Sequence, residues 1–121
     1  MFRCGIFGLL AFAFAASAGV ASAGEMNWRV QSESDYVVHL QFYSDDRNVV
    51  WPGSDKVYVL DDSAVHEYPL SCNSNEKICY GAWEKNNQSS YWGAGIDAEQ
   101  DCEDCCYRCD GGKTPIMVLN K

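Results

Sequence analysis

The chain has 121 residues, and 17 aspartates and glutamates against nine lysines and arginines give it a formal net charge of −8 at pH 7. This length fits one domain. An acidic surface repels nucleic-acid phosphates and anionic lipid headgroups, so the composition argues against nucleic acids and membrane surfaces as partners.

The N-terminal residues have the three parts of a secretory signal peptide. Arg3 supplies positive charge, residues 6–16 form an apolar run, and small residues follow that end in Ala-Ser-Ala. The apolar run is far shorter than the roughly 20 residues that span a bilayer. We therefore predict a cleavable signal peptide at residues 1–23 and a single mature domain at residues 24–121, periplasmic or secreted and without membrane insertion after cleavage.

Period-2 alternation of apolar and polar residues identifies the first predicted strand at Tyr36–Tyr43, with Val38, Leu40 and Phe42 on one face. The preceding residues 24–35 are expected to be a polar lead without a strand. Further strands are expected at residues 49–51, 56–60, 65–70, 78–83, 91–96 and 115–119.

The segments between these strands are polar and rich in turn residues, and no window shows helical periodicity. Residues 72–77 and 84–90 are expected to be loops, and residues 97–110 an acidic segment packed with cysteines. Strands recurring at this spacing predict an all-β fold, a small antiparallel β-sandwich or barrel stapled by disulfides.

Six of the seven cysteines lie after the predicted signal peptide, and cleavage of that peptide would remove the seventh, Cys4. An even number of cysteines in a short exported chain predicts three disulfides. Excluding a strained direct bridge between Cys105 and Cys106 reduces the fifteen possible pairings to twelve, and the choice among them stays open. The predicted disulfide cysteines are Cys72, Cys79, Cys102, Cys105, Cys106 and Cys109.

The last four of these cysteines form a C-x2-C-C-x2-C cluster, which has two alternative interpretations. A thiol-redox site needs a stabilised thiolate, but Glu103 and Asp104 would raise the pKa of the thiols beside them. A zinc site usually separates its two cysteine pairs by a dozen or more residues, whereas these pairs abut. Structural disulfides are therefore favoured, and no metal or cofactor is expected.

Catalytic motifs are absent from the sequence, which has two histidines, His39 and His66, and no nucleophile elbow, zinc-protease motif or P-loop. We therefore predict that the protein is not an enzyme. The acidic series at the C-terminal side suggests calcium as a minor alternative, but it fails the EF-hand loop because Cys102 stands where glycine is needed. The series is Asp97, Glu99, Asp101 and Glu103.

Aromatic side chains are the remaining functional signal, because they anchor interfaces and stack on sugars. Trp51 and Trp83 lie in apolar strands and are expected in the core. Tyr91 and Trp92, beside glycines and after a polar loop, are the predicted binding residues of an aromatic patch for a protein or an envelope glycan. A secreted inhibitor or toxin-like domain is a further alternative.

Several short stretches together resemble a family of small exported bacterial proteins. The resemblance spans roughly residues 36–109 and implies export and a disulfide-bearing β fold, but it carries over no catalytic or binding residue. The stretches are Trp51-Pro52-Gly53, Tyr58-x-Leu60, Asn75–Trp83 with its E-K-I-C-Y-G-A-W sequence, Trp92-Gly93-x-Gly95 and the cysteine cluster.

Overall fold

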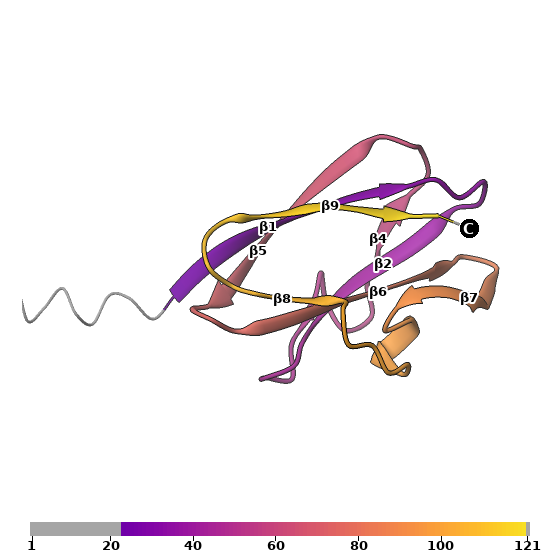
Figure 1. Ribbon diagram of the computed structural model, residues 1–121. Helices are drawn as coiled ribbons and strands as arrows, with labels where there is room; N and C mark the ends of the chain where they lie inside the picture. The colour runs from indigo at the N-terminus through magenta and orange to yellow at the C-terminus, as the bar shows by residue number, and fades with distance from the viewer. Residues whose placement is uncertain (1–22, 121) are drawn as a thin grey trace, which may run out of the picture.

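A computed structural model describes residues 23–120 (Figure 1), so the predicted signal peptide at residues 1–23 lies, apart from Ala23, outside the described residues. Nine strands and one short 3-10 helix make up the elements of this part of the chain. They are β1 (Ala23–Ser32), β2 (Val38–Ser44), β3 (Val50–Trp51), β4 (Tyr58–Leu60), β5 (Val65–Asn73), β6 (Lys77–Glu84), β7 (Asn87–Gly93), η3 (Ile96–Ala98), β8 (Cys106–Arg108) and β9 (Lys113–Leu119).

The strands form two sheets, which confirms the predicted all-β fold. One sheet has the order β5-β1-β9, and the other has the order β3-β2-β6-β7, with β4 beside β2 and β8 beside β6. Strand pairs are antiparallel except for β1 and β9, the first and last strands of residues 23–120, which run parallel at the front of the view in Figure 1.

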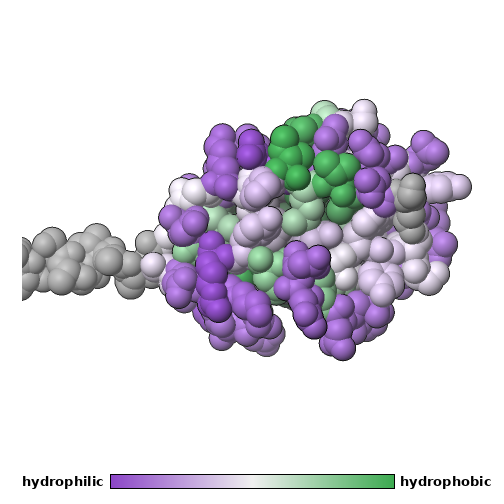
Figure 2. Space-filling model, viewed as in Figure 1, coloured by the Kyte–Doolittle hydropathy of each residue, from purple (hydrophilic) through white to green (hydrophobic). Residues whose placement is uncertain are grey.

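The core lies between the sheets, where the rings of Trp28 from β1 and Phe42 from β2 meet with centroids 4.9 Å apart. The predicted face of β2 is confirmed, since Val38, Leu40 and Phe42 are all fully buried. Polar side chains cover most of the face seen in Figure 2, around an apolar area on the side of β9, whose exposed apolar residues are Ile116 and Val118.

The prediction of a strand-free polar lead is wrong, because these residues form β1. Met26, Trp28 and Val30 alternate with polar residues and are buried against the other sheet. Partners on both sides stabilise β1: β5 pairs with it over nine residues, and β9 pairs along its second half.

The C-terminal half also differs in detail from the expectation. The predicted loop at residues 84–90 is short, because β7 begins at Asn87 and its first polar residues extend a hairpin with β6. The acidic segment contains η3 and β8. Trp83 is buried as predicted, while Trp51 is half-buried against the core.

All six predicted cysteines are paired, which confirms three disulfides. Cys79–Cys106 joins directly opposite residues of β6 and β8. The other two bridges are Cys72–Cys109 and Cys102–Cys105. Within residues 23–120, no helix has the length and apolar character needed to cross a membrane.

Candidate functional site

A cleft of about 690 Å³ lies at one end of the sandwich, and is called here the end cleft. Its walls are the connection between β1 and β2 and the hairpin between β6 and β7. The two walls are joined where the backbone N–H of Lys85 donates to the carbonyl of Val37 at 2.9 Å. The lining residues are Asp35, Tyr36, Val37, Glu84, Lys85, Asn86, Asn87 and Ser90.

Tyr36 presents an aromatic side chain at this cleft, and 67% of its surface is exposed. Two successive side-chain turns shape the backbone before it: Ser32 Oγ accepts from the N–H of Ser34 at 3.2 Å, and Ser34 Oγ accepts from the N–H of Tyr36 at 3.1 Å. Serine hydroxyls stabilise such turns by replacing backbone partners. The connection therefore holds a large apolar ring in solvent.

Glu84 is the more buried of the two acidic residues that line the cleft, with 9% of its surface exposed, whereas Asp35 is exposed. It ends β6, and no donor of residues 23–120 reaches its carboxylate. Its oxygen atoms are not among the buried, unpartnered polar atoms of residues 23–120, so they remain accessible from the cleft. Glu84 is thus an acceptor group that a ligand in the cleft can satisfy.

Tyr91 and Trp92, the predicted binding residues, are neighbours on β7 and therefore lie on opposite faces of the sheet. Tyr91 is exposed on the outer face, opposite Trp83 of β6. Trp92 is half-buried, packs against the core and donates from Nε1 to the carbonyl of Asn120 at 2.9 Å. The two side chains do not form one patch, and neither lines the end cleft.

A second feature is the segment 94–105, called here the cover segment, which lies over the outer face of β2 and β6. A Cβ atom on Gly81 would lie 2.1 Å from the carbonyl oxygen of Gly95, so only glycine permits this approach. The buried hydroxyl of Tyr43 contacts Gly95 O at 3.0 Å and Gln41 Oε1 at 2.8 Å. Burial raises the pKa of Tyr43 from 10 to about 12, so its hydroxyl stays protonated even in moderately alkaline solution.

Two disulfides meet beneath the end of the cover segment. The Sγ atoms of Cys79, Cys105 and Cys106 all lie within 4.8 Å of one another, and those of Cys105 and Cys106 are 3.9 Å apart. Cys109 is bonded to Cys72 instead, so the alternative redox or metal site would comprise Cys79 in place of Cys109. In the disulfide state these sulfur atoms offer no thiolate to a metal.

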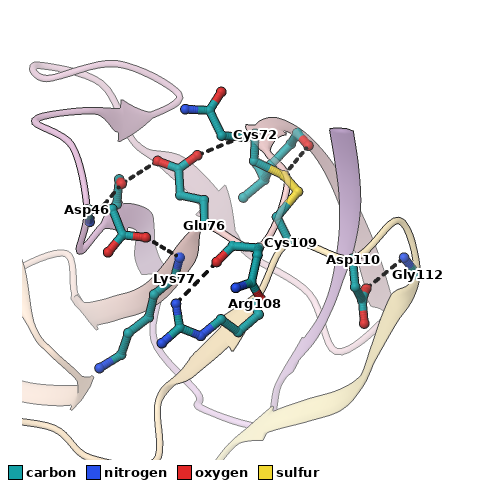
Figure 3. The surroundings of a disulfide bond; sticks show 12 residues. Asp46, Cys72, Glu76, Lys77, Arg108, Cys109, Asp110 and Gly112 are labelled. Carbon is teal, nitrogen blue, oxygen red and sulfur yellow. Dashed lines mark hydrogen bonds between the residues drawn. A yellow bond between two sulfur atoms is a disulfide. The ribbon is translucent and has the colours of Figure 1, made fainter. Parts of the chain in front are cut away.

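The Cys72–Cys109 disulfide lies beside a polar network at the turn between β5 and β6 (Figure 3). Glu76 is buried there and accepts hydrogen bonds from Arg47 and from the backbone N–H of Asn73. The hydrogen-bond donors to Glu76 all come from this chain, so we interpret the network as structural. The carboxylate of Glu84, by contrast, has no such donors among residues 23–120.

Comparisons with known proteins do not add to this geometry. No protein-family model matches the chain. No curated protein and no solved structure matches it either.

Sequence reasoning missed the end cleft, because its two principal residues look ordinary in sequence. Tyr36 was expected to begin a strand, and Glu84 to begin a loop. The one available signal was the polar run from Ser32 to Asp35, which places turn-forming side chains directly before an aromatic residue.

Proposed function

We propose that this protein is an exported, disulfide-stapled binding domain whose end cleft takes an oligosaccharide of the bacterial envelope. The observation that carries the proposal is the Glu84 carboxylate, which lines the end cleft, has no donor among residues 23–120 and keeps its oxygen atoms accessible from the cleft. Vicinal sugar hydroxyls are donors of the kind that a two-oxygen acceptor needs.

The other lining residues support a sugar in particular. The exposed Tyr36 ring offers an apolar face on which a pyranose can stack, with a hydroxyl at its tip. Asn86 and Asn87 provide amide groups that both donate and accept, and Asp35 adds a second carboxylate at the rim. A volume of about 690 Å³ lies within the usual range of small-molecule sites.

Three disulfides are compatible with an oxidising compartment, which supports the proposal of a periplasmic or secreted protein. We propose binding without catalysis, and membership of the family of small exported bacterial proteins. Two alternatives follow from the sequence: a surface around Tyr91 that binds a protein partner, and an inhibitor or toxin-like role. The variant Tyr91→Ala described below distinguishes binding at the Tyr91 surface from binding in the cleft.

Isothermal titration calorimetry with soluble peptidoglycan fragments and with N-acetylglucosamine tetramers tests the proposal. We expect saturable binding that Tyr36→Ala weakens by about fivefold or more, since a lost aromatic contact is worth 1–3 kcal/mol. Glu84→Gln keeps the shape of the residue but replaces one acceptor oxygen with a donor, and is expected to weaken binding comparably. Tyr91→Ala is the matched control on the outer face.

The proposed cleft is wrong if Tyr91→Ala abolishes sugar binding while Tyr36→Ala does not. Sugar recognition itself is wrong if neither saccharide binds while a lysine-rich peptide does so through Glu84, because the cleft would then recognise a basic protein segment.

A further inference from the structure

The sulfur atoms of two neighbouring disulfides lie close together. Cys105 is bonded to Cys102, yet its Sγ lies 3.9 Å from Cys106 Sγ and within 4.8 Å of Cys79 Sγ. The sulfur atoms that form one bridge therefore lie almost in contact with those of another. Thiol–disulfide exchange requires such an approach of an attacking sulfur to a disulfide.

Access to the two sulfur atoms of the Cys102–Cys105 bridge is unequal. Cys105 is 2% exposed, whereas Cys102 is half-buried beside exposed Asp101 and Glu103. A hollow of about 250 Å³ is lined by Cys79, Cys102 and Cys105. An external thiol therefore reaches Cys102 first, and Cys105 becomes the leaving thiolate.

We propose that Cys102–Cys105 is a thiol–disulfide exchange site, and that Cys105, once released, exchanges with the Cys79–Cys106 bridge. The external partner is a dithiol, either a small molecule or a C-x2-C protein. This inference is independent of the sugar cleft, which contains no cysteine among its lining residues.

The first step is a two-electron reduction. A thiolate of the dithiol attacks Cys102 Sγ, the bond between Cys102 and Cys105 breaks, and Cys105 leaves as a thiolate. The second thiol of the partner then attacks the mixed disulfide, so the partner leaves as a disulfide and Cys102 as a thiolate. Two protons from the dithiol end on the two cysteines.

The second step is an internal exchange without net oxidation. Once released from Cys102, the Cys105 side chain rotates to approach Cys79 Sγ from the side away from Cys106; its thiolate then attacks Cys79 Sγ, a Cys79–Cys105 bond forms, and the Cys79–Cys106 bond breaks. The electron pair goes to Cys106, which takes the proton that Cys105 lost. Attack on Cys106 instead would form a strained bridge between sequence neighbours, so Cys79 is the electrophile.

The exchange removes the covalent link between β8 and β6 while keeping the cover segment bonded to β6. Cys79–Cys106 is the covalent link between these strands, and the Cys105 carbonyl already accepts from the N–H of Tyr80 on β6 at 3.0 Å. A Cys79–Cys105 bridge would therefore form between groups that are already held together.

Two single variants of the oxidised protein test the internal step without any reductant. Samples are quenched in acid, unfolded, labelled with N-ethylmaleimide and mapped by peptide mass spectrometry. In Cys102→Ser we expect the label to divide between Cys105 and Cys106, together with a Cys79–Cys105 peptide. In the matched control Cys105→Ser, the label should stay on Cys102. Label confined to Cys105 in the first variant overturns the internal exchange.

The external step is tested on the unmodified protein by titration with dithiothreitol, which also gives an answer if a variant does not fold. We expect Cys102–Cys105 to open at the lowest concentrations, with a Cys79–Cys105 peptide at intermediate ones and Cys72–Cys109 still closed. The proposed site is wrong if Cys102–Cys105 persists while either other bridge is reduced.

Discussion

The guanidinium of Arg47 makes a two-point contact with the carboxylate of Glu76. Arg47 Nε lies 2.7 Å from Oε2, and its terminal nitrogen lies 2.8 Å from Oε1. Ser44 Oγ donates to the same carboxylate, and so does the N–H of Asn73 at 2.9 Å. The contact joins the turn after β2 to the turn between β5 and β6.

Acid should weaken the fold through Glu76. The hydrogen bonds from Arg47, and those from Ser44 and Asn73, lower the pKa of this carboxyl from 4.5 to about 2. Its contribution is therefore fully present above pH 4.5 and is lost as the pH falls towards 2. At pH 7 the shift corresponds to about 3 kcal/mol, so we expect Glu76→Gln to reduce the free energy of unfolding in urea by about that amount.

A matched control for Glu76→Gln is Glu67→Gln, because Glu67 is exposed and lies 3.4 Å from Lys113. We expect this variant to cost less than about 1 kcal/mol. Equal losses for Glu76→Gln at pH 7 and pH 2 would contradict the assignment.

Removing different disulfides should have unequal effects on stability. Cys72–Cys109 joins residues 37 apart in sequence, and Cys102–Cys105 joins residues three apart. By the loop-entropy relation, the first contributes about 4 kcal/mol and the second about 2 kcal/mol. Paired alanine substitutions, compared by guanidinium unfolding, should reproduce this order; a greater loss without Cys102–Cys105 would reverse it.

The Tyr43 hydroxyl should hold the cover segment in place. Tyr43→Phe leaves Gln41 Oε1 and Gly95 O without this donor, at an expected cost of about 1–2 kcal/mol. Amide exchange at residues 94–105 should rise as well. Tyr91→Phe, which changes an exposed tyrosine, is the control and should leave both quantities unchanged; equal protection of the segment in both variants would rule out this role.

The sequence predicted the part of the fold where one face of a strand is uniformly apolar. Val38, Leu40 and Phe42 alternate cleanly, and their burial follows. Trp28 and Val30 of β1 also alternate with other residues, but their neighbours are polar or charged, so the strand was not predicted. Its pairing with β5 and β9 depends on residues far along the chain.

The end cleft could not be predicted because its walls meet only in the folded chain. Tyr36 and Glu84 are 48 positions apart in the numbering and become neighbours through the pairing of β2 with β6, in which Val38 lies opposite Glu84. The disulfide pairing was open for the same reason. Cys79 and Cys106 become partners because β6 and β8 place them directly opposite.

The parallel pairing of β1 with β9 determines when the fold can be completed. Until the residues after Gly112 have been synthesised, Met26, Trp28 and Val30 belong to a strand with a neighbour on one side only. A contact between β1 and β9 also closes nearly all of residues 23–120 into one loop, which slows folding. The emerging polypeptide thus stays without its finished sheet until β9 has been synthesised, and a chain truncated before β9 would expose the edge of β1 to association with other strands.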